Sequence, residues 1–306
     1  MKSIYLLLLL PLFAQSQDNS LLWKITGPEE QYTSYLFGSI HSNDSLLNTF
    51  SDEWWRAFLS CQVLAGEVNS TDPKEMMASL ENSMMKDTSL SDLYTPDEFS
   101  RVKKYLYDHL DSRSVMVVGR MKPFYIMASI MEMTTNEGPY SQVMDIRLQA
   151  LANQNKMKVV GLESTAEQSK SIEVISLKDQ AAMLLEFIDA QDPERIQLNP
   201  PKTPVMQEDM ERLENAYLDQ NLDSLNVMMG EMDEMMPSEF SESLLGKRNE
   251  RFVANLLPLL QTNNVFCAVG AMHLAGPEGM IAMLKKRGYK VEPIKFTFTE
   301  SKLKLD

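Results

Sequence analysis

Two histidines of this 306-residue chain share one local pattern, in which a glycine lies three residues before the imidazole. The first segment, GSIH, ends in His41, and the second, GAMH, ends in His273; each follows a short apolar run. The third histidine, His109, lies in a polar helical stretch and lacks that glycine. Imidazole nitrogens bind transition metals and act as general bases, so the pair predicts a site for one of these two chemistries.

Two glutamates end apolar runs in the same way, Glu67 after LAG and Glu163 after VGL. If the four runs are neighbouring parallel strands, all four polar side chains meet at the carboxyl edge of the sheet. That edge is where open α/β sheets bind their ligands. Two imidazoles and two carboxylates there are a suitable donor set for a divalent cation.

Arg248 is a charged residue on an apolar helical stripe, four residues after Leu244 and four before Phe252. A guanidinium among apolar side chains needs a carboxylate partner, and Glu67 or Glu163 would serve. The alternative is that Arg248 extends to water from the edge of the stripe.

The elements that must position these residues alternate between short strands and long helices. Apolar runs rich in Val, Ile and Phe predict strands at 34–40, 62–68, 158–162, 264–270 and 290–298, with an edge strand at 23–26. The alternation predicts an α/β fold with a central mixed, largely parallel sheet and flanking helices. Residues 73–150 and 165–260 are too long for ordinary connections, so we expect large helical insertions there.

Residues 1–16 have the layout of a signal peptide. Lys2 is followed by an apolar run at 4–13, which is too short to span a bilayer, and small residues precede a cleavage site before Gln17. We expect a periplasmic or secreted protein without a membrane span after cleavage, in which residues 17–306 form one domain.

The composition narrows the class of partner. A net charge of −14 repels phosphate backbones, so we expect no nucleic acid partner. The only cysteines, Cys61 and Cys267, are too few for a cysteine-rich zinc site. They form either a disulfide or two buried thiols, and the sequence does not contain the distance between them.

Three stretches, at 21–44, 144–168 and 248–294, resemble the TraB/GumN family, which includes the TIKI metalloproteases. The most specific part is the ending GAMHLAGPEGM. The resemblance implies that the motifs ending in His41 and His273 are the active-site signature, and that Glu67, Glu163 and Arg248 belong to the same cluster. It also implies a fold related to the erythromycin-esterase and ChaN-like proteins. Ser39 stands where the family often has threonine.

The leading hypothesis is a metal-dependent hydrolase that acts on a peptide or protein substrate. His41, His273 and one of Glu67 or Glu163 would bind zinc, manganese or cobalt, which lowers the pKa of a bound water. The other carboxylate would be the general base, and Arg248 would stabilise the developing oxyanion.

Two alternatives remain open. In a metal-free, esterase-like hydrolase, a histidine oriented by a carboxylate would activate water directly; the chain has no G-x-S-x-G nucleophile motif. In a non-catalytic protein, the same pocket would retain a peptide or haem. Metal dependence of turnover separates the first two, and retention of a ligand without turnover would indicate the third.

Overall fold

The computed structural model describes residues 19–29, 31–40, 49–134, 143–192, 206–235 and 242–302. Its strands are β1 (Leu22–Thr26), β2 (Thr33–Ser39), β3 (Val63–Gly66), β4 (Lys158–Gly161), β5 (Val265–Gly270) and β6 (Lys290–Ile294). Its helices are α1 (Asp52–Leu59), α2 (Pro73–Ser83), η1 (Leu90–Leu93), α3 (Pro96–His109), α4 (Ser112–Val118), α5 (Pro123–Thr134), α6 (Met144–Gln154), α7 (Thr165–Ile172), α8 (Leu177–Asp189), α10 (Met206–Leu218), α11 (Leu222–Met235), the π-helical turn η3 (Glu242–Gly246), α13 (Lys247–Leu260), η4 (Ala271–His273) and α14 (Met280–Lys286).

The six strands form one sheet in the order β4-β3-β5-β2-β1-β6. The strands β4, β3, β5 and β2 are parallel, whereas β1 runs antiparallel to both β2 and β6. Ser39 is aligned with Gly270, and Gly66 with both Ala268 and Gly161, so the four parallel strands end at one edge. The predicted α/β class and the mixed, largely parallel sheet are confirmed.

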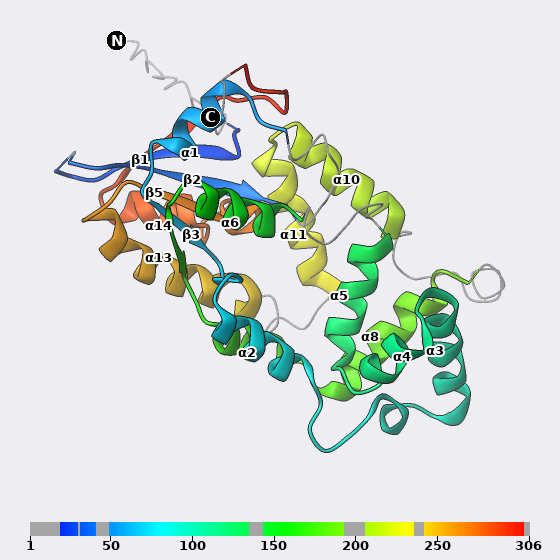
Figure 1. The fold of residues 1–306 in the computed structure, drawn as a ribbon. Helices are drawn as coiled ribbons and strands as arrows, with labels where there is room; N and C mark the ends of the chain where they lie inside the picture. The colour runs from blue at the N-terminus through cyan, green and yellow to red at the C-terminus, as the bar shows by residue number, and fades with distance from the viewer. Residues whose placement is uncertain are drawn as a thin grey trace, which may run out of the picture.

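The sheet lies between two layers of helix, α1 with α6 on one side and α13 with α14 on the other (Figure 1). The chain steps from β2 through β3 to β4 in one direction along the sheet and then returns to β5. Because such crossovers are right-handed, the two directions place their helices on opposite faces. Helix α13 therefore runs beneath the strands whose ends carry the polar residues.

The last predicted strand is shorter than expected, since β6 ends at Ile294 and not at Phe298. Beyond it the chain leaves the sheet edge, and the Ser51 N–H donates to the Thr297 carbonyl at 2.9 Å. Phe296 and Phe298 turn inward, and Phe296 packs edge-on against Phe37 at 6.0 Å between ring centroids. The sequence predicted a longer strand because the apolar alternation continues to Phe298. That alternation reflects side chains that fill the core, and not backbone pairing within the sheet.

The described parts of the long segments between β3 and β4 and between β4 and β5 are largely helical. They share a second hydrophobic core that lies apart from the sheet, at the right of Figure 1. Leu184 and Phe187 of α8 belong to this core together with Val102 of α3 and Ile126 of α5. Helices from two distant segments therefore complete one helical lobe, a pairing that periodicity alone does not reveal.

Cys61 and Cys267 are both buried free thiols, so they form no disulfide. Burial raises the pKa of the Cys61 thiol to about 12 and that of Cys267 further, which keeps both protonated. Within the part of the chain that the structure describes, no helix is long and apolar enough to cross a membrane. Residues 1–16 lie outside that part, so the signal peptide stays a prediction.

Candidate functional site

The polar residues expected at the carboxyl edge follow the parallel strands there. Glu67 comes directly after β3, Glu163 follows β4 by two residues, and His273 lies in the short helix η4 that continues β5. Ile40 follows β2, which is the parallel neighbour of β5. His41 lies outside the described residues, so its predicted approach to His273 stays a prediction.

Arg248 joins the two glutamates. Its Nη2 donates to Glu67 Oε2 and to Glu163 Oε1, each at 2.6 Å, and its Nε donates to Glu163 Oε1 at 2.8 Å. Only 8% of the Arg248 side chain is exposed, and none of the Glu163 side chain. The predicted buried ion pair is confirmed, with both candidate carboxylates and not one of them, and the solvated alternative is wrong.

The charges of this cluster are balanced by a second arginine. Arg251 donates to Glu163 Oε2 through Nε at 3.1 Å and through Nη2 at 2.5 Å. Burial opposes the charged form of Arg248, but Glu67 and Glu163 outweigh it and raise the pKa of the guanidinium above its ordinary value. Two carboxylates and two guanidiniums sum to zero, which reduces the cost of burying each charge.

Arg251 was missed by the sequence reasoning, although a signal existed. It follows Arg248 by three residues on α13, and residues at that spacing lie on one face of a helix. A second arginine beside one already placed near a carboxylate could therefore have been added to the cluster.

His273 is buried beside this ion-pair network. Its Nε2 lies 3.7 Å from Glu67 Oε1 and 3.4 Å from Arg248 Nη1, and its Nδ1 lies 2.6 Å from Asn249 Oδ1. Burial lowers the pKa of His273 to about 4; the negative charge of Glu67 opposes this shift, and Arg248 adds to it. The imidazole is therefore neutral at pH 7.

The lowered pKa of His273 makes the free energy of unfolding depend on pH. The ordinary pKa of 6.5 applies in the unfolded chain and about 4 in the folded one, so between these values the unfolded chain binds more protons. The free energy of unfolding that depends on neutral His273 is fully present above pH 6.5. It is lost as the pH falls toward 4, by at most about 1.4 kcal/mol per pH unit. Urea unfolding of metal-free wild type and His273→Gln should show it as a pH-dependent difference. A difference that stays constant over this range would contradict it.

The glycines of both Gly-x-x-His motifs have packing reasons. A methyl group on Gly270 would lie 3.3 Å from Glu67 Oε1, whereas glycine lets that oxygen accept the Gly270 N–H at 2.8 Å. A methyl group on Gly38 would lie 3.0 Å from Cα and Cβ of Ala271 in the other motif. Each small residue therefore permits a close approach at the edge where β2 and β5 end.

The end of β2 is held by side chains that the motifs do not include. Ser39 Oγ donates to Asp145 Oδ1 at 2.6 Å, and the Tyr217 hydroxyl donates to the Gly38 carbonyl at 2.7 Å. A threonine at Ser39 would supply the same hydroxyl, so the departure from the family's common residue preserves the donor.

Glu67 is the carboxylate of the cluster that is accessible. Its side chain is 19% exposed and borders a cavity of about 150 Å³ that is also lined by Asp145 and Gln149. Glu163, by contrast, has both carboxylate oxygens hydrogen-bonded to arginines and no exposed side-chain surface. A small molecule or a water that enters the cavity therefore meets Glu67 and not Glu163.

The described donors fit a metal ion in part. Two ligand atoms on one ion lie roughly 3–4 Å apart when each bond is about 2.0–2.2 Å, and His273 Nε2 and Glu67 Oε1 satisfy this at 3.7 Å. Across the described ranges, however, no three or more His, Cys, Asp or Glu side chains are arranged so that they could hold one metal ion together. A third protein ligand would have to come from elsewhere, and His41 is the candidate from the sequence.

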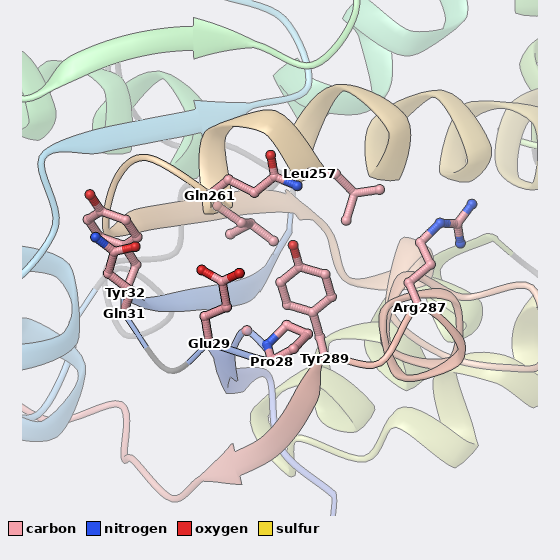
Figure 2. A pocket seen from close by; sticks show the side chains of 10 residues that line it. Pro28, Glu29, Gln31, Tyr32, Leu257, Gln261, Arg287 and Tyr289 are labelled. Carbon is pink, nitrogen blue, oxygen red and sulfur yellow. The ribbon is translucent and has the colours of Figure 1, made fainter.

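A separate groove of about 570 Å³ lies at the opposite end of α13 (Figure 2). Tyr32, Tyr289, Leu257 and Arg287 are among its lining residues. It is formed by the β1–β2 turn, the last turn of α13 and the segment before β6, at the amino edge of the parallel strands. No residue of the polar cluster lines it.

Comparisons with known proteins place this chain in a recognisable group. A family model described as the TraB/PrgY/gumN family matches residues 21–293. The chain is 24% identical to metalloprotease TIKI2 of Xenopus tropicalis, in an alignment that covers 95% of this chain and 63% of that protein. It is 26% identical to metalloprotease TIKI1 of the same species and 22% identical to metalloprotease TIKI1 of Homo sapiens, over 90% and 91% of this chain and 62% of each relative. The chain thus spans less than two thirds of the length of these curated relatives, and no solved structure matches it.

Proposed function

This chain belongs to the TraB/PrgY/gumN family, and we propose that it is an exported hydrolase that cleaves peptide bonds with the help of a divalent metal ion. The observation that carries the proposal is the cluster of Glu67, Glu163, Arg248 and His273 at the carboxyl edge of the sheet, in which Glu67 is partly exposed and the other three are buried. The choice of peptide substrates is supported by relatives that are named metalloproteases.

His273 Nε2 and Glu67 Oε1 are the described atoms that would hold the ion, with His41 as the proposed third ligand. Zinc, manganese and cobalt all accept imidazole and carboxylate ligands. When bound, such an ion lowers the pKa of a coordinated water toward neutrality. The neutral state of His273 at pH 7 suits this role, because a metal ligand needs an unprotonated nitrogen.

Arg248 and Glu163 take supporting roles in this proposal. The Arg248 guanidinium lies beside Nε2 of His273 and is held there by three hydrogen bonds to carboxylates, so it is positioned to stabilise negative charge on a substrate oxygen. Glu163 is the anchor of Arg248 and Arg251. Both of its carboxylate oxygens are buried and already accept hydrogen bonds from arginines, so Glu163 is a poor acceptor for a proton from substrate or water.

Removal of the metal tests this proposal directly. Protein purified from the exported fraction should begin at or near Gln17, and its metal content is measured before a peptide library is offered with and without a chelator. We expect cleavage to be lost with the chelator and restored by zinc, manganese or cobalt. Absence of cleavage in metal-loaded protein would contradict the proposal, and an N-terminus at Met1 would contradict the exported part of it.

A metal-free hydrolase is the second candidate, and one observation favours it. The described cluster is already neutral in charge, and Arg248 Nη1 lies 3.4 Å from the nitrogen that would bind the ion. In that case His273 Nε2 would take the proton from water, although a pKa of about 4 makes it a weak base at neutral pH. Cleavage that resists the chelator would favour this candidate.

A further inference from the structure

The side chain of Asn249 lies between the His273 imidazole and the backbone carbonyl of Glu278. It is the residue after Arg248 on α13, and only 2% of it is exposed. Its Nδ2 donates to the Glu278 carbonyl oxygen at 2.8 Å, and its Oδ1 lies 2.6 Å from His273 Nδ1. The side chain therefore makes two short polar contacts in opposite directions.

These two contacts decide which imidazole nitrogen carries a proton. A carbonyl oxygen only accepts hydrogen bonds, so the amide nitrogen of Asn249 must face Glu278. The opposite orientation would place two oxygens 2.8 Å apart without a proton between them. The amide oxygen then faces His273, and because this oxygen has no hydrogen, the proton in the 2.6 Å contact belongs to Nδ1.

The Glu278 carbonyl is itself held in place by the loop that follows the second motif. Gly276 adopts a φ of +79°, which is the left-handed region that favours glycine. A methyl group on Gly279 would overlap the carbonyl oxygens of Leu274 and Ala275, so this position requires glycine as well. The segment HLAGPEG thus forms a compact turn whose carbonyl at Glu278 points to α13.

We propose that Asn249 is a positioning residue that keeps the proton of His273 on Nδ1 and turns Nε2 toward Glu67 and Arg248. We call this series of contacts the relay: the glycine-dependent turn holds the Glu278 carbonyl, which accepts from the Asn249 amide, which in turn accepts from the imidazole. Its importance for hydrolysis rests on the proposed function, because it prepares the nitrogen that would bind the metal. Partners of this kind, on the far nitrogen of a metal-binding histidine, set its tautomer and orientation.

Nitrogen NMR of the metal-free protein labelled with ¹⁵N-histidine tests the relay without any substrate. The His273 signals are identified by their absence in His273→Gln. In the wild type at pH 7 we expect a protonated Nδ1 and an unprotonated Nε2. Asn249→Leu removes the acceptor, so the proton should move in part or wholly to Nε2, where Glu67 Oε1 lies 3.7 Å away.

Asn255→Leu is the matched control. Asn255 lies on the same helix and also donates from Nδ2 to a backbone carbonyl, that of Leu162 at 2.7 Å, in a contact that does not involve His273. It should lose a similar hydrogen bond without any change in the His273 spectrum. As a second readout, zinc alone should bind Asn249→Leu about 10–100-fold more weakly than the control.

A wild-type His273 protonated on Nε2 would overturn the relay without recourse to any variant. An unchanged tautomer in folded Asn249→Leu would overturn it as well. The proposed function is tested separately. A protein that shows the expected tautomer but neither binds metal nor cleaves peptides would support the relay and contradict the proposed hydrolase function.

Discussion

Replacement of Arg248 by methionine is expected to lower the free energy of unfolding by about 3–5 kcal/mol, the usual cost of removing one partner from a buried ion pair. Methionine fills a similar volume, so the loss comes from the charges that remain. Glu163 would keep only Arg251, and Glu67 Oε2 would lose its 2.6 Å bond to a guanidinium. Equilibrium unfolding in urea at pH 7 measures the change.

Two variants separate this effect from a general loss of charge. Arg56 is 64% exposed and lies 3.7 Å from Asp52, so Arg56→Met should cost about 1 kcal/mol or less. Arg248→Lys keeps the charge but not the planar fork that reaches both glutamates, and it should fall between the two. If Arg248→Met is no less stable than Arg56→Met, the buried network contributes nothing to stability.

His273→Gln should abolish peptide hydrolysis while the protein stays folded. Loss of an outer partner of a metal ligand costs about 10–100-fold in activity, and loss of the ligand itself should exceed that range. Glutamine can still bond to Asn249, so we expect a modest loss of stability and an unchanged circular dichroism spectrum. Initial rates on a peptide that the wild type cleaves, at equal concentrations of folded protein, give the comparison.

His109→Gln is the control for this substitution. His109 is exposed on α3, stacks on Tyr105 and lies in the helical lobe, apart from the polar cluster. It should therefore leave the hydrolysis rate unchanged. If His273→Gln retains the wild-type rate, His273 is a structural residue, and the site must be sought elsewhere in the chain.

The strands of this protein could be read from the sequence because their apolar runs are local. The apolar run predicted as a strand at 264–270 forms β5 (Val265–Gly270), and its position before the second Gly-x-x-His motif brings His273 to the strand end. The same local reasoning placed Glu67 and Glu163. Arg248 was found because a charge on an apolar stripe conflicts with its surroundings, and such a conflict requires a partner.

Contacts between distant segments could not be predicted in this way, because no local sequence pattern encodes them. The sequence left open which glutamate would meet Arg248, and the sheet order brought both within 2.6 Å. It left open whether the two cysteines pair, and the structure keeps them as separate buried thiols. The second core, built by α8 with α3 and α5, also depends on how two insertions fold against each other.

The chemistry of the site is divided in the same way. The sequence by itself determined the residue types and the strand ends that carry them, because side-chain chemistry and strand periodicity are properties of short segments. Only the tertiary structure decided that Glu163 is buried between two arginines while Glu67 faces a cavity, and that Asn249 reaches His273 Nδ1. Burial and hydrogen-bond geometry determine whether a carboxylate or an imidazole can react. Both arise only when separate segments of the chain are packed together, 24 residues apart for Asn249 and His273 and 85 apart for Arg248 and Glu163.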